Sequence, residues 1–205
     1  MIMKARELAV PGAFEFTPEV FPDSRGRFLS PYQEGPFIQA VGHPLFPVAQ
    51  SNHSESRRGV VRGVHFTVTP PGTAKYVYCP RGRSLDIAVD LRVGSPTFGK
   101  CDAVRLDQVD FRAIYLPIGF GHAFVALDDD TVMSYLISGR YERELELAIS
   151  VLDPELALPL PAGLDPILSE RDSVAPTLAE AVEQGILPDY DTCMELDRAL
   201  HRERP

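Results

Sequence analysis

Proline and glycine divide most of this 205-residue chain into short segments. Nineteen prolines and fifteen glycines recur at short intervals, in stretches such as TVTPPGTAKY, CPRGRS and VGSPTFG. Both residues are unfavourable inside helices, so little room is left for a long helix before about residue 170. The segments between them are long enough for strands. The chain is therefore predicted to consist mainly of short β-strands.

The segment SLDIAVDLRV is the clearest strand, because apolar residues from Leu85 to Val93 alternate with polar or small residues from Ser84 to Arg92. Further strands are predicted in eight segments of suitable composition: 14–21, 60–68, 74–79, 103–108, 113–118, 122–127, 131–138 and 146–152. Many short strands separated by turn residues are typical of a β-sandwich or barrel. The sequence thus predicts an all-β fold.

The composition changes near Asp165, where the chain becomes suitable for helices. A T-x-x-E capping box at Thr177 and Glu180, followed by Gly185, predicts one short helix. The same box at Thr192 and Glu195 predicts a second. We expect one domain over residues 1–205, with residues 165–205 forming a mostly helical tail that packs on the β-structure.

Charge and cysteine content exclude several classes of protein. The formal net charge of -9 argues against general binding to nucleic acid or to anionic membranes, which depends on clustered Lys and Arg. No segment approaches the roughly 18 apolar residues of a membrane span, and the first residues do not form a signal peptide. Three widely separated cysteines suggest neither a disulfide framework nor a thiolate zinc site. We expect a reduced, cytoplasmic protein.

The apolar segment VVRGVHF carries one arginine and one histidine. Strict period-2 alternation places His65 on a face with Val61, Gly63 and Thr67, and Arg62 on the opposite face. A strand that only filled a core would carry neither charged group. The segment therefore either has a role beyond packing, or its histidine is a structural residue that is held by hydrogen bonds.

Other titratable residues fall on the faces of neighbouring strands. Lys75 shares a face with Val77 in one strand, and Asp86 shares a face with Asp90 in the next. If these faces and that of His65 line one interior, their pKa values can be tuned for proton transfer. The alternatives are an exposed strand lysine and two carboxylates on the solvated face of an edge strand.

The stretch LPIGFGHAFVAL places Pro117, Gly119 and His122 in a P-x-G-x-x-H arrangement. This arrangement resembles the second signature of the cupin superfamily, whose fold is a double-stranded β-helix, or jelly roll. Metal-dependent cupins supply an H-x-H pair from the first signature, where this chain has His65 followed by Phe66 and Thr67. One histidine in place of two argues against a metal at this position.

Seven separated segments carry a more specific resemblance: FPDSRGRF, SNHSESRRGVVRGVHF, PPGTAKYVYCPRG, DIAVDLRVGSPTFG, YLPIGFGHAF, MSYLISGRY and LSERDSVAPTL. Their order and spacing between about Phe14 and Asp189 resemble those of the TDP-4-keto-6-deoxyglucose 3,5-epimerases. The resemblance implies a cupin jelly roll with short C-terminal helices, a homodimer, and no metal or other cofactor. It also implies epimerisation of the carbons next to the ketone of a TDP-linked 4-keto-6-deoxy sugar.

The resemblance assigns four catalytic roles. His65 falls on the catalytic base, Asp172 on the aspartate that orients it, Tyr135 on the proton donor and Lys75 on the enolate-stabilising lysine. These residue types suit the reaction, because removal of a proton next to a ketone requires a base near neutral pKa and a positive charge at the developing oxyanion. Inversion also requires an acid on the opposite face of the ring.

The resemblance further implies substrate contacts. Arg25 and Arg62 would meet the pyrophosphate, for which forked guanidinium donors are suited, and Phe21 would stack near thymine. The remaining positions on which substrate contacts fall are Gln50, Asn52, His122 and Tyr141. For Arg62 and His65 to reach one site, the strand needs a twist or a bulge, for which Gly63 provides a place.

Several positions differ from the usual pattern of this family. Ser30 replaces a glutamate, Thr67 replaces a glutamine, and the glycine and alanine that flank His122 are exchanged. These differences resemble the antibiotic-pathway epimerases, some of which invert only C3 or only C5. The inverted carbon and the native sugar stay open, as do three other activities: a TDP-sugar 3,4-ketoisomerase, a non-catalytic sugar-nucleotide-binding cupin and a metal-dependent dioxygenase.

Overall fold

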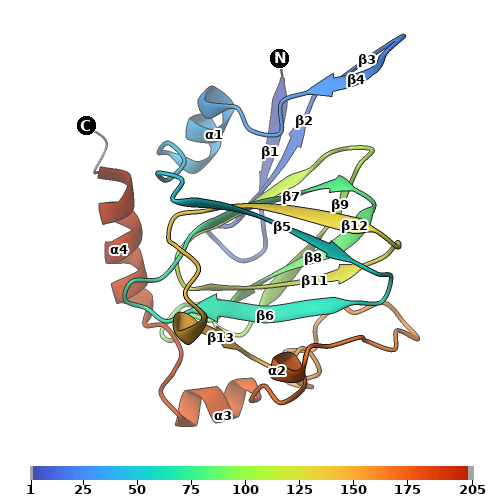
Figure 1. The fold of residues 1–205 in the computed structure, drawn as a ribbon. Helices are drawn as coiled ribbons and strands as arrows, with labels where there is room; N and C mark the ends of the chain where they lie inside the picture. The colour runs from blue at the N-terminus through green and yellow to red at the C-terminus, as the bar shows by residue number, and fades with distance from the viewer. Residues whose placement is uncertain (1, 203–205) are drawn as a thin grey trace.

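A computed structural model describes residues 2–202 of the chain. Two antiparallel sheets face each other in a jelly roll, and a separate two-stranded hairpin projects from one end (Figure 1). The strand order is β1-β2-β10-β7-β12-β5 in the six-stranded sheet and β13-β6-β11-β8-β9 in the five-stranded sheet, with β3-β4 as the hairpin. The predicted all-β, cupin-like jelly roll is confirmed.

The strands are short, as the proline and glycine spacing predicts. They are β1 Met3–Glu7, β2 Phe14–Pro18, β3 Val20–Asp23, β4 Gly26–Leu29, β5 Gln50–Ser56, β6 Val61–Thr67, β7 Lys75–Arg81, β8 Arg83–Asp90, β9 Cys101–Asp107, β10 Ala113–Leu116, β11 Phe120–Ala126, β12 Thr131–Ile137 and β13 Glu146–Ala148. The helical elements are α1 Glu34–Val41, η1 Arg143–Leu145, α2 Glu170–Ser173, α3 Leu178–Glu183 and α4 Tyr190–Arg202. No helix within residues 2–202 is long and apolar enough to cross a membrane.

Apolar side chains from both sheets meet in the interior of the jelly roll. Val77 of β7, Ala88 of β8, Phe124 of β11 and Met133 of β12 belong to this core, and each is at most 1% exposed. The predicted apolar face of β8 points away from this interior. Ile87 and its alternating neighbours pack in a second cluster, on the outer side of the five-stranded sheet. The polar face of β8 therefore points into the interior.

The C-terminal region covers the outer faces of both sheets. Residues between β13 and α3, with Leu178 and Ala181 of α3, pack on the five-stranded sheet. Helix α4 and helix α1 cover the six-stranded sheet, where Cys193 and Phe37 join one buried cluster (Figure 1). Burial of these apolar side chains is the main force that holds the tail against the strands.

One predicted capping box is confirmed and one is wrong. At α3, the Thr177 hydroxyl accepts from the Glu180 amide and the Glu180 carboxylate accepts from the Thr177 amide at 2.8 Å. Helix α4 instead begins before Thr192, because the Asp189 carboxylate accepts from the Thr192 amide at 2.9 Å. A carboxylate is a strong acceptor for the free N–H groups of a helix N-terminus, so Asp189 takes this role.

Six elements have no specific prediction: β1, β4, β5, α1, η1 and α2. Strand β5 has the sequence QSNHSES, which contains no apolar residue that could show alternation. It lies at the edge of the six-stranded sheet and pairs only with β12. An edge strand that borders a polar cavity need not have an apolar face, so periodicity could not detect it.

Candidate active site

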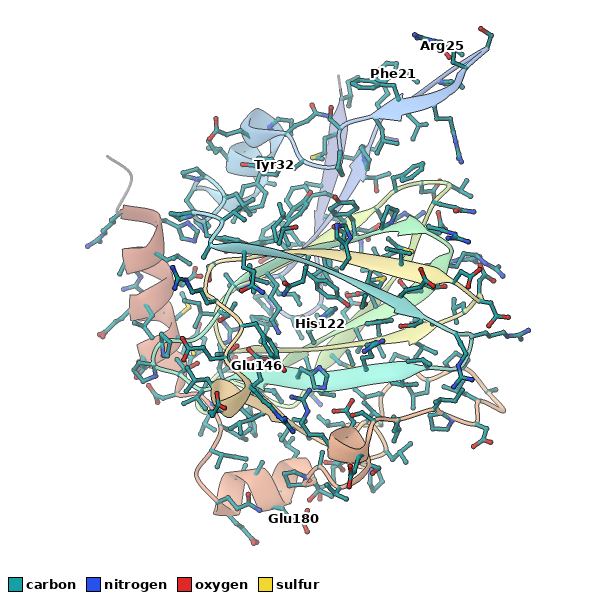
Figure 2. All side chains as sticks on the ribbon, in the orientation of Figure 1. Phe21, Arg25, Tyr32, His122, Glu146 and Glu180 are labelled. Atoms are coloured by element: carbon teal, nitrogen blue, oxygen red, sulfur yellow. The ribbon has the colours of Figure 1, made fainter. Side chains whose placement is uncertain are left out.

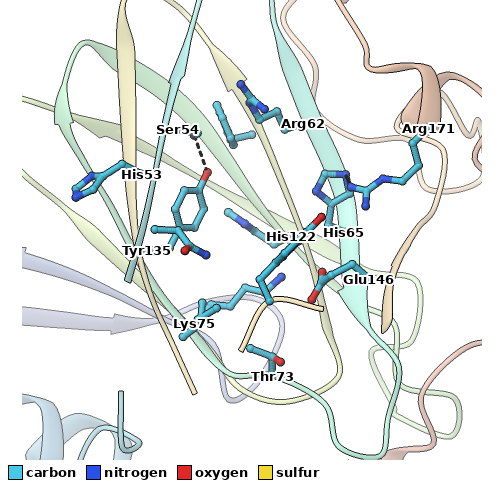
Figure 3. Close-up of a pocket in the computed structure, with 14 residues that line it drawn as sticks. His53, Ser54, Arg62, His65, Thr73, Lys75, His122, Tyr135, Glu146 and Arg171 are labelled. Carbon is cyan, nitrogen blue, oxygen red and sulfur yellow. Dashed lines mark hydrogen bonds between the residues drawn. The ribbon is translucent and has the colours of Figure 1, made fainter. Parts of the chain in front are cut away.

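A cavity of about 260 Å³ opens between the two sheets (Figure 3). We call it the central pocket. Its walls come from β5, β6, β7, β11, β12 and β13, with one arginine from α2. The lining residues are Asn52, His53, Ser54, Arg62, His65, Thr73, Lys75, His122, Phe124, Tyr135, Ile137, Tyr141, Glu146 and Arg171.

Strand β6 contains a bulge where it pairs with β11. His65 lies opposite His122, but Arg62 lies opposite Phe124, so two residues of β6 face the single residue Ala123. The extra residue changes the parity of the strand. The bulge predicted near Gly63 is therefore confirmed.

The bulge brings Arg62 and His65 to the same wall of the central pocket. Val61 packs in the outer cluster, away from His65, so the expectation from strict alternation is wrong at this point. Gly63 adopts φ +123°, and an added Cβ would overlap the His122 carbonyl and Ala123. Only glycine fits this backbone conformation and this close approach.

His65 is paired with Asp172, a residue of α2 in the C-terminal region. The His65 Nε2 atom lies 2.7 Å from the Asp172 Oδ1 atom, and Asp172 is only 3% exposed. A proton on Nε2 would be donated to the Asp172 carboxylate and would leave Nδ1 as the basic nitrogen, whereas the Arg171 guanidinium, which only donates, competes for the same Nε2 atom. The Ser169 hydroxyl caps α2 by accepting from the Asp172 amide at 3.1 Å. Residues far apart in the chain thus orient the imidazole.

The surroundings favour a neutral His65. Burial lowers the pKa of His65, and the nearby cations Arg171 and Lys75 lower it further, while Asp172 raises it. The Arg171 Nη2 atom lies 2.6 Å from His65 Nε2. The pKa of Asp172 is also lowered, although burial opposes this, because His65, Ser169 and Arg171 favour its ionised form. The pair can therefore work as a neutral base and an ionised carboxylate.

Lys75 lies at the start of β7, in the central pocket and partly buried. Burial lowers its pKa, and the carboxylates of Glu146 and Asp86 partly oppose this effect. The alternative of an exposed strand lysine is wrong. A cation held in a cavity of low polarity is well placed to stabilise negative charge that develops on a bound molecule.

The two aspartates of β8 have different surroundings. His122 Nε2 lies 2.9 Å from Asp86 Oδ2, and both side chains are buried beneath the central pocket. Asp90 instead pairs with Arg92 at 2.8 Å and lies outside the lining of this pocket. The expected convergence therefore includes Asp86 but not Asp90. The edge-strand alternative is wrong for both, because β8 lies between β11 and β9.

Tyr135 enters the central pocket from β12 of the six-stranded sheet, whereas His65 enters from the five-stranded sheet. Figure 3 shows the two side chains on opposite sides of the cavity. Burial raises the pKa of Tyr135 well above its usual value, and the hydroxyl lies 3.3 Å from the Ser54 hydroxyl. Tyr135 therefore keeps its proton and can donate it.

Four of the predicted substrate-contacting residues line the central pocket: Asn52, Arg62, His122 and Tyr141. Gln50 lies next to them and supports two of them. Its side-chain amide donates to Asn52 Oδ1 at 2.7 Å, and its carbonyl accepts from the Tyr141 amide at 3.0 Å. Gln50 therefore contributes to the shape of this wall.

The structure does not bring Phe21 and Arg25 to the central pocket of the same chain. Phe21 lies on β3 and Arg25 lies in the turn to β4, on the hairpin that projects from the body of the molecule (Figure 2). The Arg25 side chain is 88% exposed and pairs with Asp23 at 2.6 Å. Within one chain, these two residues are available to another molecule.

Sequence reasoning missed two charged residues of the central pocket, Glu146 and Arg171. Glu146 accepts a hydrogen bond from the Thr67 hydroxyl at 2.7 Å and faces Lys75. Arg171 directly precedes Asp172, so its position next to a proposed site residue was an available signal. Nothing in the local pattern of ELAIS distinguishes Glu146 from an exposed strand glutamate.

A histidine that can act as a base and a protonated tyrosine, on opposite walls of a cavity in a cupin-like jelly roll, suit an enzyme that inverts a carbon by moving protons, an epimerase. Comparison with known proteins gives the same class. The chain belongs to the dTDP-4-dehydrorhamnose 3,5-epimerase family, whose model matches residues 7–180.

Three relatives illustrate the similarity. The dTDP-4-dehydrorhamnose 3-epimerase of Streptomyces niveus is 51% identical over 191 residues, which cover 93% of this chain and 91% of the relative. The crystal structure of NovW, a 4-keto-6-deoxy sugar epimerase from the novobiocin biosynthetic gene cluster of Streptomyces spheroides, matches with a TM-score of 0.90 and 50% identity, covering 94% and 96% of the two chains. ChmJ, a 3'-monoepimerase from Streptomyces bikiniensis in complex with dTDP-quinovose, matches with a TM-score of 0.91 and 43% identity, covering 97% and 100%.

Proposed function

We propose that this enzyme epimerises a TDP-linked 4-keto-6-deoxyhexose at C3, C5 or both, in the biosynthesis of an antibiotic deoxysugar. The observation that carries the proposal is the placement of His65 and Tyr135 on opposite walls of one pocket. The dTDP-sugar bound to ChmJ and the gene cluster of NovW support this substrate class and this pathway type.

The proposed reaction has two proton transfers. Neutral His65 removes the proton from the carbon next to the C4 ketone, and Asp172 stabilises the imidazolium that forms. The electron pair moves onto the ketone oxygen, and the Lys75 ammonium stabilises the resulting enolate. Tyr135 then donates its proton to the same carbon from the opposite face. The reaction needs no net change in oxidation state, so these side chains suffice without a cofactor.

The nucleotide part of the substrate requires a cationic and polar wall. Arg62 shares the wall of His65, and its guanidinium donates to the Ser56 hydroxyl at 3.1 Å, which holds the side chain in an extended orientation. In the proposed complex, Arg62 binds the pyrophosphate while Asn52, His122 and Tyr141 contact the sugar or the nucleotide. Gln50 would orient Asn52 and the Tyr141 backbone.

We propose that the enzyme is a homodimer in which the β3–β4 hairpin of one copy completes the pocket of the other. The projection of this hairpin supports the proposal, because Phe21 is 37% exposed and Phe28 is 64% exposed on the same short ribbon. Exposed aromatic rings beside an exposed guanidinium are suited to a nucleotide base and its phosphates. The tail with Asp172 would stay with its own pocket, so residues 1–205 would form one domain.

Mixing two inactive variants tests the exchanged hairpin. Co-folding of Arg25→Ala with His65→Ala is expected to restore about a quarter of the wild-type activity, because half of the dimers are mixed and each contains one intact site. The matched control is co-folding of His65→Ala with Lys75→Ala, two pocket variants that both keep a wild-type hairpin, and this mixture restores nothing because both pockets of every dimer are defective. No recovery, or a monomer in sedimentation velocity, would contradict the proposal.

The proposed location is the cytoplasm. Cys79, Cys101 and Cys193 are all free thiols, and two of them are buried without a disulfide partner. Free cysteines are typical of proteins in a reducing compartment.

Deuterium exchange is the most direct test of the reaction. The protein is incubated with TDP-4-keto-6-deoxyglucose in deuterated water while the H3 and H5 signals are followed by NMR. Loss of one or both signals, with inversion, is expected because each epimerisation replaces a carbon-bound proton by one from solvent, and the lost signal identifies the carbon. Movement of the carbonyl would indicate a 3,4-ketoisomerase. Binding without any exchange would indicate a sugar-nucleotide-binding cupin.

A further inference from the structure

A second group of titratable side chains lies outside the central pocket, where the C-terminal helix packs on the body of the molecule. His43 belongs to the loop that follows α1, and Asp197 and His201 belong to α4. Figure 1 shows α4 alongside this loop. One potential ligand atom from each of the three residues lies within 4.8 Å of the other two. None of the three residues lines the central pocket or has a part in the proposed reaction.

The hydrogen bonding of His43 leaves one ring nitrogen available. Its Nδ1 atom lies 2.9 Å from the carbonyl oxygen of Pro44. A carbonyl only accepts, so Nδ1 carries the proton and Nε2 has a free lone pair. Metal-binding histidines commonly donate their other N–H group to a backbone carbonyl in this way.

Asp197 and His201 are four residues apart on α4 and therefore lie on the same face of the helix. Their Oδ1 and Nε2 atoms are 3.8 Å apart, too far for a hydrogen bond but close to the separation of two ligands of one ion. The side chain of His201 is only 6% exposed. Within residues 2–202, neither of its ring nitrogens nor Asp197 Oδ1 has a hydrogen-bond partner.

Buried polar atoms without partners are energetically unfavourable, and a cation would satisfy two of the three, Asp197 Oδ1 and one ring nitrogen of His201, because an imidazole binds a metal ion through a single nitrogen. The rings of His43 and His201 are stacked face to face, with centroids 3.5 Å apart and an interplanar angle of 26°, so the two imidazoles already lie together and one ring turns to direct both lone pairs at one ion. Asp197 supplies the negative charge that two neutral imidazoles lack. Two nitrogen ligands and one carboxylate suit Zn²⁺, whereas Mg²⁺ and Ca²⁺ prefer all-oxygen sites.

We propose that His43, Asp197 and His201 form a zinc site that fastens α4 to the loop after α1. The fourth ligand is water. The nearby cavity, which His43, Tyr115 and Asp197 line, provides an access path from solvent. The site is structural, since it lies apart from the central pocket and joins segments that are about 155 residues apart in the chain. Metal bound here would stabilise the folded chain by linkage, because the unfolded chain does not hold the three ligands together.

Calorimetric titration with zinc tests the site directly. The full-length protein is treated with EDTA, dialysed and titrated with Zn²⁺. One equivalent per chain is expected to bind and to raise Tm by about 5 °C at saturating metal. Loss of a residue that only hydrogen-bonds to a metal ligand weakens metal binding by about 10–100-fold. His201→Gln and Asp197→Asn change the ligands themselves, so each is expected to weaken zinc binding by at least about 100-fold.

Glu195→Gln is the matched control, because it removes an exposed carboxylate from the same helix without touching the cluster. This variant is expected to bind zinc as the wild type does. Co²⁺ gives a second reading, since a tetrahedral site produces visible absorption that His43→Gln should abolish. A wild-type protein that binds no zinc would overturn the proposal even if a variant fails to fold. Equal zinc binding by the wild type, His201→Gln and Asp197→Asn would overturn it as well.

Discussion

Replacing His65 by alanine is expected to lower kcat for epimerisation by about 10²–10⁴-fold, the usual contribution of general base catalysis. Exchange at both carbons should be affected, because the proposed mechanism uses the same base, His65, for C3 and for C5. Deuterium exchange at H3 and H5, followed by NMR, measures the effect. Binding of TDP should change little, since Arg62 and the other side chains of the pocket remain. Wild-type exchange in the variant would contradict the assignment of the base.

The dependence on pH gives the same prediction a second readout. His65 works as a base only when it is neutral, and burial lowers its pKa below the ordinary value of 6.5. The value of kcat/KM should therefore fall on the acid side with an apparent pKa below 6.5. Asp172 raises the pKa of His65, so Asp172→Asn should move this acid limb to still lower pH while it reduces the plateau. A shift to higher pH would contradict the pairing.

Tyr135→Phe is expected to separate proton removal from inversion. The change deletes only the hydroxyl of a buried ring, whose hydrogen-bond neighbour is Ser54 at 3.3 Å. His65 can still form the enolate, but the proton that returns comes from the side of the base. The substrate should therefore exchange its proton for solvent deuterium with retained configuration, while inversion falls by about 10²–10⁴-fold.

The control for this experiment is Tyr78→Phe. Tyr78 lies on β7 opposite Ser134 of β12, so it belongs to the same sheet as Tyr135, but it does not line the central pocket. Inversion at the wild-type rate is expected in this variant. Full inversion by Tyr135→Phe would show that another group, such as a water molecule, supplies the proton.

Regular alternation and capping patterns made much of the fold predictable. Strand β8 and helix α3 follow directly from alternation in SLDIAVDLRV and from the box at Thr177. Strand β5 and the exposed hairpin could not be found in the same way, because their positions depend on a polar cavity and on surfaces outside one chain. The start of α4 was misplaced because the Asp189 carboxylate accepts from both the amide and the hydroxyl of Thr192, so the threonine lies inside the helix.

The residues of the candidate site that belong to a sequence motif could be predicted. Those that reach the site only because the fold brings them close could not. The motif segments single out His65, Lys75 and Tyr135, which line one pocket, and Asp172, which pairs with His65. Glu146 and Arg171 join them only through folding, and Asp90 is excluded only because Arg92 is closer. Phe21 and Arg25 lie on the projecting hairpin, and the order of segments in one chain does not reveal whether such residues serve the pocket of the same chain or that of a second molecule.

The bulge at Gly63 also fixes the separation between the side chains of Arg62 and His65. Arg62 and His65 point into the same pocket from one strand, three positions apart across the bulge. A hydrogen-bonded strand does not stretch, so the interval between the anion-binding group and the proton-abstracting group cannot adjust to the molecule that enters. The strand would therefore select substrates by the distance between their phosphate groups and their acidic carbon. Sugars joined to the nucleotide through one phosphate, or through three, would place their acidic carbon out of register with the imidazole.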